Sequence, residues 1–235
     1  MTTTVDARER LIFALDVPTI EEAEALVGRL GDAVVFYKIG LELFTAGDAA
    51  GFVRLLKQAG KKVFVDLKLF DVPATVGRAV ARLAELEVDF LSVHGNQAMM
   101  EAAAAARGSS RVLAVTALTS LDEGDMRDLG FPCEILELVA SRARRAMEAG
   151  LDGVIASARE AAMLRAELGS RLMVVTPGIR PVANREEDDQ KRVMTPAEAI
   201  RAGADHLVVG RPIRDAADPS AAAEAIVAEI AAALS

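Results

Sequence analysis

The chain has 235 residues, of which 52% are hydrophobic and 26% are charged, and its formal net charge is -8. This composition is too apolar for a disordered protein, and it lacks the basic balance that a nucleic-acid-binding face requires. We expect no signal peptide and no membrane span, because no apolar run approaches the roughly 20 residues that a membrane helix needs. The single cysteine, Cys133, cannot form an internal disulfide. We therefore expect a cytoplasmic protein in which this thiol is incidental.

Short β-rich segments alternate with helical segments along the whole chain. The predicted strands cover residues 11–16, 34–40, 61–68, 90–95, 111–118, 153–157, 171–176 and 206–210. The clearest predicted helices cover residues 20–30, 73–87, 134–149, 159–168 and 219–234. The strands are near-continuous apolar runs, which is typical of strands buried on both faces of a sheet. The alternation therefore predicts a parallel sheet with helices packed against it.

Eight such units in one chain of this length favour a (β/α)8 TIM barrel of the α/β class. We expect residues 1–235 to form a single domain, because no linker-like segment interrupts the pattern. A doubly wound open sheet is the competing architecture. The segment after the first strand, "ALDVPTIEEA", carries no glycine-rich fingerprint, which disfavours a dinucleotide-binding version of that sheet.

Polar side chains are predicted at the carboxyl end of each strand, where barrel enzymes place their catalytic groups. They are Asp16, Lys38, Asp66 with Lys68, His94, Thr119, Ser157, "TPGIRP" (176–181) and "VVGRP" (208–212). The opposite strand ends read as ordinary turns, and His206 reads as a surface or capping residue. This asymmetry predicts an active site at the carboxyl ends, with His94 in a supporting role.

The segment "KKVFVDLKLFDVPATV" (61–76) places charges at the exit of a buried strand. Asp66 and Lys68 lie two residues apart, so their side chains point to the same face, and Asp71 follows in the loop. Asp16 and Lys38 end neighbouring strands and should lie close to them. A purely structural ion-pair network is a poor use of buried charge. A metal site is another interpretation, but Lys68 would compete with the cation. The alternation instead suits a lysine that acts as a proton donor.

The extended pattern "DLKLFDVPATV" resembles the signature of the orotidine 5'-monophosphate decarboxylase family. Further segments match that family in order along nearly the whole chain: "FALDVPT", "YKIGLELF", "SVHG", "TALTS", "VTPGIRP", "DDQKRVMTP" and "VVGRPI". The resemblance implies a cofactor-independent and metal-independent carboxy-lyase. Such an enzyme converts orotidine 5'-monophosphate to uridine 5'-monophosphate in de novo pyrimidine biosynthesis.

The resemblance also implies a role for individual residues. Lys68 would protonate C6 of the pyrimidine, and Asp66 would lie beside the substrate carboxylate. Lys38 would contact the ribose and hold Asp66, while Asp16 would bind the ribose or pyrimidine side. The family is homodimeric, and Asp71 and Thr75 would reach into the partner's site. The remaining substrate-binding positions are Thr119 at the pyrimidine, Arg180, and Gln190, Gly210 and Arg211 at the phosphate.

The phosphate end is also suggested by the residues themselves. Gly210 permits close approach of the backbone to an oxyanion, and Arg211 adds a forked donor. The charged segment "PVANREEDDQKRVMTP" (181–196) lies between the seventh strand and the eighth. A loop of this length in a compact domain is usually functional or disordered. We expect it to be a lid that closes when Gln190 reaches the phosphate.

Two other functions remain open at this point. The first is a magnesium-dependent sugar-phosphate decarboxylase of the 3-keto-gulonate-6-phosphate type on the same scaffold. The uninterrupted "DLKLFDVPATV" and "DDQKRVMTP" argue against it. The second is a catalytically inactive phosphate-binding barrel. The intact set of Asp66, Lys68 and Asp71 argues against that.

Overall fold

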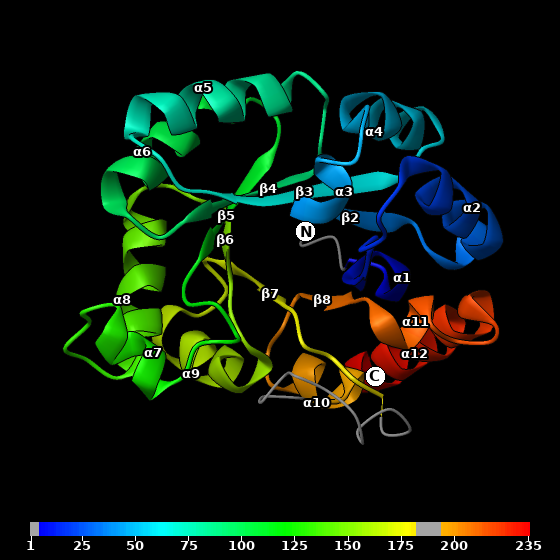
Figure 1. The fold of residues 1–235 in the computed structure, drawn as a ribbon. Helices are drawn as coiled ribbons and strands as arrows, with labels where there is room; N and C mark the ends of the chain where they lie inside the picture. The colour runs from blue at the N-terminus through cyan, green and yellow to red at the C-terminus, as the bar shows by residue number, and fades with distance from the viewer. Residues whose placement is uncertain (1–4, 182–193) are drawn as a thin grey trace.

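The computed structural model describes residues 5–181 and 194–235. Its strands are all parallel and close into an eight-stranded barrel, in which β8 pairs with β1. Helices surround the strands as an outer ring (Figure 1). This closed order confirms the predicted (β/α)8 barrel and excludes the doubly wound open sheet.

All eight predicted strands are present, with ends that differ from the prediction by up to three residues. They are β1 (Leu11–Ala14), β2 (Phe36–Gly40), β3 (Lys62–Leu69), β4 (Phe90–His94), β5 (Arg111–Val115), β6 (Gly153–Ile155), β7 (Met173–Thr176) and β8 (His206–Val209). Each pairs in parallel with its neighbour in sequence. The polar residues predicted at the strand exits therefore converge on one end of the barrel.

The five predicted helices are α2 (Ile20–Leu30), α5 (Pro73–Ala84), α8 (Ile135–Glu148), α9 (Ala158–Leu168) and α12 (Pro219–Leu234). The structure adds α1 (Ala7–Arg10), the 3-10 turn η1 (Gly31–Ala33), α3 (Leu41–Phe44), α4 (Ala49–Gln58), α6 (Gln97–Ala106), α7 (Glu123–Asp128), α10 (Pro196–Arg201) and α11 (Arg211–Arg214). None of the described helices is long and apolar enough to cross a membrane.

Helix starts follow from local capping chemistry. Thr19 begins α2, and its hydroxyl accepts a hydrogen bond from the backbone N–H of Glu22. Asp48 and Asp218 cap α4 and α12 in the same way with their carboxylates. These side chains satisfy backbone donors that have no partner within the helix. Pro73 occupies the first turn of α5, where a missing N–H costs nothing.

The interior of the barrel is filled separately from the layer between strands and helices. Phe36, Phe64 and Phe90 point inward from β2, β3 and β4, with ring centroids 4.9 Å apart for Phe36–Phe90 and 5.9 Å for Phe64–Phe90. Side chains alternate along a strand, so the next inward positions toward the carboxyl end of β2 and β3 are Lys38 and Asp66. An apolar floor therefore lies directly beneath the charged residues.

His206 corrects the sequence interpretation, which had it at the surface or in a cap. It is the first residue of β8, only 4% exposed, and its ring contacts Phe36 and Phe90 edge-on at 6.0 Å and 5.2 Å. Burial, with smaller contributions from the charges of Arg10, Arg111 and Lys62, lowers its pKa to about 3. The predicted strand already began at His206, but a polar residue at a strand start was taken to face outward, whereas strand alternation turns this side chain into the barrel.

The buried neutral His206 predicts a pH-dependent stability. Its pKa is lower in the folded chain than the unfolded value of about 6.5, so the folded state resists protonation. The contribution is therefore complete above about pH 6.5 and is lost as the pH falls toward 3, by up to about 1.4 kcal/mol per pH unit. Urea unfolding at about pH 7 and about pH 5 measures this slope.

The control for that slope is His206→Phe, which keeps an aromatic ring but cannot titrate. Space for the larger ring exists, because His206 lines a cavity at this end of the barrel. We expect the variant to lose less stability than the wild type between the two pH values. Equal losses in the two proteins would contradict this account of His206.

Candidate active site

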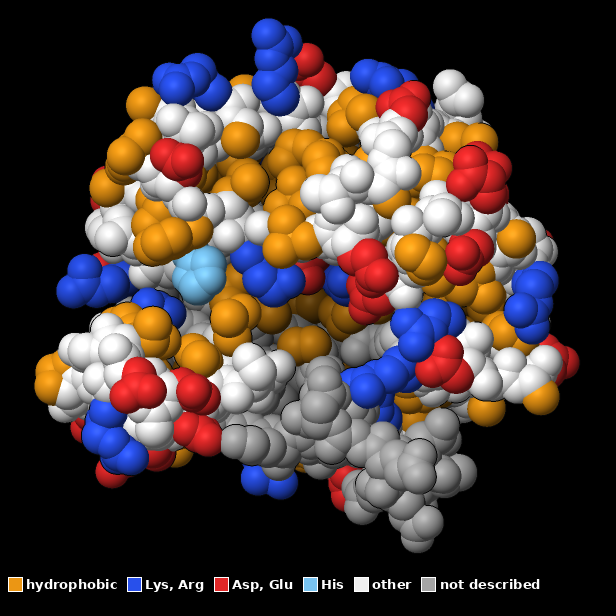
Figure 2. Space-filling view, viewed as in Figure 1, with side chains coloured by type: hydrophobic (Ala, Val, Ile, Leu, Met, Phe, Trp, Pro, Cys, Tyr) orange, Lys and Arg blue, Asp and Glu red, His pale blue; other side chains and the backbone are white. Residues whose placement is uncertain are grey.

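A cavity of about 250 Å³ opens at the carboxyl ends of the strands. The predicted site residues that line it are Asp16, Lys38, Asp66, Lys68, Thr119, Arg180, Gly210 and Arg211. Figure 2 shows basic and acidic side chains gathered around the hollow in the middle of this face. Residues from β1, β2, β3, β5, β7 and β8 or the segments that follow them thus meet at one site, as the sequence predicted.

Asp66 lies at the centre of a row of alternating charges. Its Oδ2 accepts a hydrogen bond from Lys68 Nζ at 2.8 Å and lies 3.9 Å from Lys38 Nζ. Lys38 Nζ in turn donates to Asp16 Oδ1 at 3.0 Å. Each charge therefore has an opposite charge beside it.

The two ends of this row are more open than its middle. Lys38 and Asp66 are 8% and 7% exposed. The side chains of Lys68 and Asp16 are 32% and 46% exposed. A network that only stabilised the barrel would have no need to turn an ammonium group and a carboxylate toward a cavity. The arrangement instead turns Lys68 and Asp16 toward the cavity and holds them from behind.

The convergence of Asp66 and Lys68 depends on an irregular strand. Val65 pairs with Leu91, but the next pair is Leu69 with Val93, so β3 carries extra residues opposite β4. Lys68 has a φ of 50°, a left-handed conformation that is unusual for a lysine. The sequence argument put both side chains on one face by simple alternation. The structure brings them together through this bulge.

Ser92 is the site residue that the sequence analysis missed. It lies on β4, is 1% exposed, donates from Oγ to Asp66 Oδ1 at 2.7 Å and accepts from the Lys68 backbone N–H at 2.9 Å. The available signal was an isolated serine at an inward position of an otherwise apolar strand. A sequence pattern alone does not show which strand bulges toward it.

Gly40 ends β2 beside Lys38, and its lack of a side chain is required there. A Cβ built at this position would lie 2.9 Å from Lys38 Nζ and 3.4 Å from Asp16 Oδ1. Any other residue would therefore push the ammonium group away from its carboxylate. The glycine of "YKIG" keeps the space in which the Lys38–Asp16 ion pair forms.

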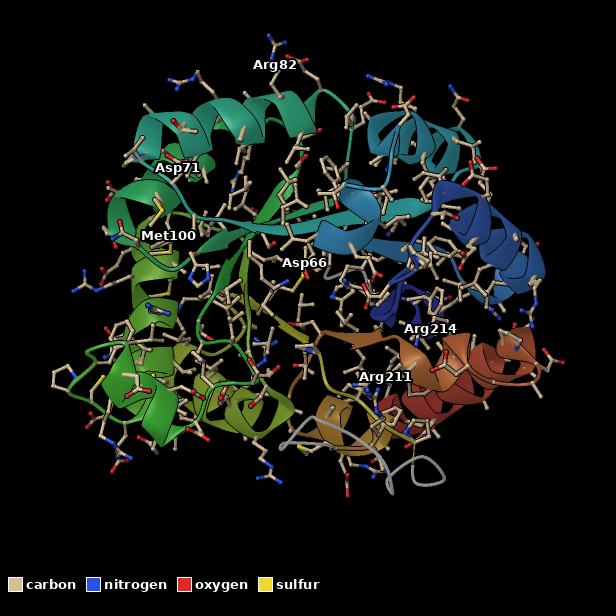
Figure 3. The ribbon with its side chains drawn as sticks, in the orientation of Figure 1. Asp66, Asp71, Arg82, Met100, Arg211 and Arg214 are labelled. Carbon is tan, nitrogen blue, oxygen red and sulfur yellow. The ribbon has the colours of Figure 1, made fainter. Side chains whose placement is uncertain are left out.

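The cavity is also lined by Gly210 and Arg211, which were predicted for a phosphate, and by Arg180, predicted as a further substrate-binding residue. Arg180 is 6% exposed, and its backbone N–H donates to the carbonyl of Met194 at 3.0 Å. Arg211 begins the short helix α11 directly after Gly210. Figure 3 shows Asp66 near the centre of the barrel mouth and Arg211 on the side formed by α11. The cavity thus has a mixed-charge wall and a wall that carries guanidinium groups.

Three predicted residues are not among those that line this cavity. Asp71 is exposed near the rim, where its Oδ1 accepts from the backbone N–H of Val72 (Figure 3). Thr75 follows in α5 and accepts a hydrogen bond from Arg78. Gln190 lies outside the described residues, as does most of the predicted lid segment. Ser157, another polar strand end, precedes α9, where its N–H donates to Glu160.

His94 ends β4 close to the site, and its ring lies 5.1 Å from that of Phe70. Burial lowers its pKa, and the charges of Arg142 and Lys68 lower it further. A neutral ring that supports the Phe70–Asp71 segment fits this geometry, and the supporting role stays a prediction.

A larger cavity of about 650 Å³ lies at the opposite, amino end of the barrel, beside His206. Its charges are largely matched in pairs, such as Lys62 with Glu9 and Lys57 with Asp89, at 2.6 Å each. The expectation of ordinary turns at this end is therefore too simple. The row of charges that includes Asp66 and Lys68 lines the cavity at the mouth and not this one.

The carboxylates of the mouth are poorly placed to hold a metal ion. Asp66 accepts from Lys68 and Ser92, and Asp16 accepts from Lys38. A divalent cation would have to displace these ammonium groups before it gained the oxygen ligands it prefers. Within residues 5–181 and 194–235, no three His, Cys, Asp or Glu side chains converge on a point that could hold a metal.

A closed (β/α)8 barrel with ionised groups at the carboxyl ends of its strands is the architecture of a barrel enzyme. Residues 9–226 match the model of the orotidine 5'-phosphate decarboxylase / HUMPS family. The orotidine 5'-phosphate decarboxylase of Methylococcus capsulatus is 62% identical over 226 residues, which cover 96% of this chain and 93% of the relative. The protein of that name from Rhodopseudomonas palustris (strain HaA2) is 55% identical, with 95% of each chain covered.

Solved structures agree with the sequence comparison. The crystal structure of orotidine 5'-phosphate decarboxylase from Lactobacillus acidophilus superposes with a TM-score of 0.84 at 36% identity, covering 94% of this chain and 98% of the other. The structure of that name from Pyrococcus horikoshii has a TM-score of 0.77 at 26% identity, covering 94% and 99%. The chain therefore belongs to the orotidine 5'-phosphate decarboxylase / HUMPS family.

The row of charges predicts a coupled effect on stability. Lys38→Met leaves Asp66 and Asp16 without a shared counter-charge, and we expect the free energy of unfolding to fall by about 2 kcal/mol. The same substitution should cost less in an Asp66→Asn background, because the stranded carboxylate is then gone. A double-mutant cycle by urea unfolding should give a coupling energy of about 1 kcal/mol.

The matched control is Arg82→Met, which breaks the exposed Arg82–Glu85 pair on α5. That change should alter the free energy of unfolding by less than about 0.5 kcal/mol. Strictly additive effects of Lys38→Met and Asp66→Asn on the free energy of unfolding would show that the two side chains do not interact.

Proposed function

We propose that this chain decarboxylates orotidine 5'-monophosphate to uridine 5'-monophosphate and CO2 without a cofactor. The family membership and the relatives of that name support the activity. The observation that carries it is the hydrogen bond between Lys68 Nζ and Asp66 Oδ2, formed by a half-exposed ammonium group against a buried carboxylate. The proposal includes a cytoplasmic location and a role in de novo pyrimidine biosynthesis.

Lys68 supplies the charge and the proton that the reaction needs. Loss of CO2 leaves an electron pair on C6 of the pyrimidine, and no carbonyl group is placed to delocalise it simply. An ammonium group beside C6 stabilises that developing charge and then donates a proton to it. Lys68 faces the cavity while Asp66 and the bulge hold it from behind.

Asp66 would act on the other side of the bond that breaks, which joins C6 of the pyrimidine to the substrate carboxylate. The substrate carboxylate would lie next to the Asp66 carboxylate, whose charge disfavours the bound ground state. Departure of neutral CO2 removes that repulsion, so the interaction is less unfavourable in the transition state. Lys38, within reach of both Asp66 and Asp16, places a positive charge between the two carboxylates.

The remaining predicted residues would bind the nucleotide. Lys38 would contact the ribose, Asp16 the ribose or pyrimidine side, and Thr119 would hydrogen-bond the pyrimidine. Gly210 and Arg211 would hold the phosphate, and Arg180 would be a further substrate-binding residue in the same cavity. Gln190, assigned to the same phosphate, lies outside the described residues. Binding energy from the phosphate would help to hold the pyrimidine against the unfavourable charge of Asp66.

We also propose that the enzyme is a homodimer in which Asp71 and Thr75 complete the partner's site. Asp71 does not line the cavity of its own chain and is exposed at the rim. Its neighbours Phe70 and Val72 are 71% and 63% exposed, which is unusual for large apolar side chains that flank a charged residue. A second copy of the chain would cover them, as exposed apolar patches in soluble proteins often mark an interface.

The first test is decarboxylation of orotidine 5'-monophosphate followed by ultraviolet absorbance. We expect the wild type to turn over with and without EDTA. Lys68→Ala should lower kcat by at least about 10³-fold, because both the stabilising charge and the proton are lost. Lys57→Ala is the matched control, since this lysine pairs with Asp89 at the amino end of the barrel. Turnover only of a sugar phosphate, and only with magnesium, would favour the alternative decarboxylase.

A subunit-mixing experiment tests the shared site. Lys68→Ala and Asp71→Ala are each expected to be inactive alone. In a heterodimer of the two, one site carries both defects and the other carries neither. Random pairing during co-expression should therefore restore about one quarter of the wild-type activity.

The control for the mixing experiment pairs Lys68→Ala with Asp66→Asn. Both of these residues lie in the site of their own chain, so every site of that heterodimer keeps one defect and no activity should return. A failure of the Lys68→Ala and Asp71→Ala mixture to recover activity would show that Asp71 does not act across an interface.

A further inference from the structure

We propose that Ser92 is a positioning residue that aims Asp66 and holds the backbone of Lys68 in its left-handed conformation. This inference rests on the decarboxylation proposed above and adds one residue, Ser92, to the site that would carry it out. Ser92 is not among the residues that line the cavity. It therefore acts through the two charged residues rather than on the substrate.

Ser92 lies one inward position beyond Phe90 on β4, directly above the apolar floor of the barrel. It is 1% exposed, so its hydroxyl cannot be satisfied by bulk water. A buried hydroxyl without partners is unfavourable, and strand positions facing a barrel interior are normally apolar. The hydroxyl of a serine at this position therefore needs hydrogen-bond partners inside the barrel.

The hydroxyl makes one donated and one accepted hydrogen bond. A serine has one O–H to donate, and the donation goes to Asp66 Oδ1 at 2.7 Å. A lone pair of the same oxygen accepts from the Lys68 backbone N–H at 2.9 Å. One atom thus joins the side chain of Asp66 to the main chain of Lys68.

These bonds lie where β3 departs from regular pairing. The residues between Val65 and Leu69 face only the single residue between Leu91 and Val93 on β4, which is Ser92. The N–H of Lys68 donates to the serine oxygen in place of a strand carbonyl. A left-handed backbone costs energy in a residue with a Cβ, and it persists only where surrounding contacts maintain it. Ser92 provides such a contact.

The orientation of Asp66 follows from the same contacts. With Oδ1 bound to Ser92, Oδ2 is left facing both Lys68 at 2.8 Å and Lys38 at 3.9 Å. If the hydroxyl were removed, the carboxylate could rotate and the bulge could relax. Lys68 would then no longer be held at one place relative to the cavity.

The test compares Ser92→Ala with the wild type in decarboxylation and in binding of uridine 5'-monophosphate. We expect kcat to fall about 10- to 100-fold, because small displacements of a reacting group are costly. KM and the Kd of the product should change by less than about threefold, because Ser92 does not touch the nucleotide or the phosphate wall. A loss of fold alone would lower only the fraction of active protein. The kcat calculated per folded site would then stay at the wild-type value.

Two further variants keep the test decisive. Ser92→Thr retains the hydroxyl and should recover most of kcat. Ser92→Cys keeps the shape with a weak donor and should be intermediate, and it replaces the alanine variant if that protein does not fold. Ser110→Ala is the matched control, because Ser110 is 2% exposed and its Oγ donates to the Val88 carbonyl at 2.7 Å just before β5. That variant should keep wild-type kcat and KM.

The outcomes separate the two proposals. An active wild type with an unchanged kcat in Ser92→Ala, or in Ser92→Cys if alanine fails to fold, would overturn the role of Ser92 alone. A rise in KM at constant kcat would also overturn it, because Ser92 would then act in binding. An inactive wild type would overturn the proposed function itself.

Discussion

The buried carboxylate of Asp66 is the interaction on which the rest of the site depends. A carboxylate that is 7% exposed must be compensated by donors, since an unpaired buried charge is far too costly. Its partners come from three strands: Lys68 on β3 and Ser92 on β4 donate hydrogen bonds to it, and Lys38 on β2 lies within ion-pair distance. Satisfying Asp66 therefore ties three neighbouring strands together at the barrel mouth and leaves Lys68 and Asp16 turned toward the cavity.

The barrel separates this polar layer from an apolar one. The phenylalanine floor of Phe36, Phe64 and Phe90 excludes water from beneath, so the charges above it act in a medium where electrostatic interactions are strong. The same alternation that buries these rings places Lys38 and Asp66 one step higher. The apolar core and the candidate site thus occupy successive layers of the same strands, and Arg180 and Arg211 also line the cavity.

Much of this arrangement could be predicted from the sequence, and the failures have identifiable causes. The strands, the main helices and the polar strand ends were predicted from local patterns. His206 was wrongly assigned to the surface because it is a polar residue at the first position of the predicted strand, and its inward direction was not considered. Ser92 was missed because its importance comes from the bulge opposite it. Gly40 was quoted as part of a motif, but its close approach to Lys38 is visible only in three dimensions.

The sequence by itself determined the alternation of strands and helices, the capping residues, the family signature and the charged residues at the end of the third strand. These properties depend on neighbours along the chain, and local patterns record them. Only the tertiary structure decided which inward residues meet. Asp66 and Ser92 are 26 positions apart, and Lys38 and Asp16 are 22 apart. Their contacts depend on the register of parallel strands and on closure of the barrel, which are set by packing between distant segments and not by any local stretch of sequence.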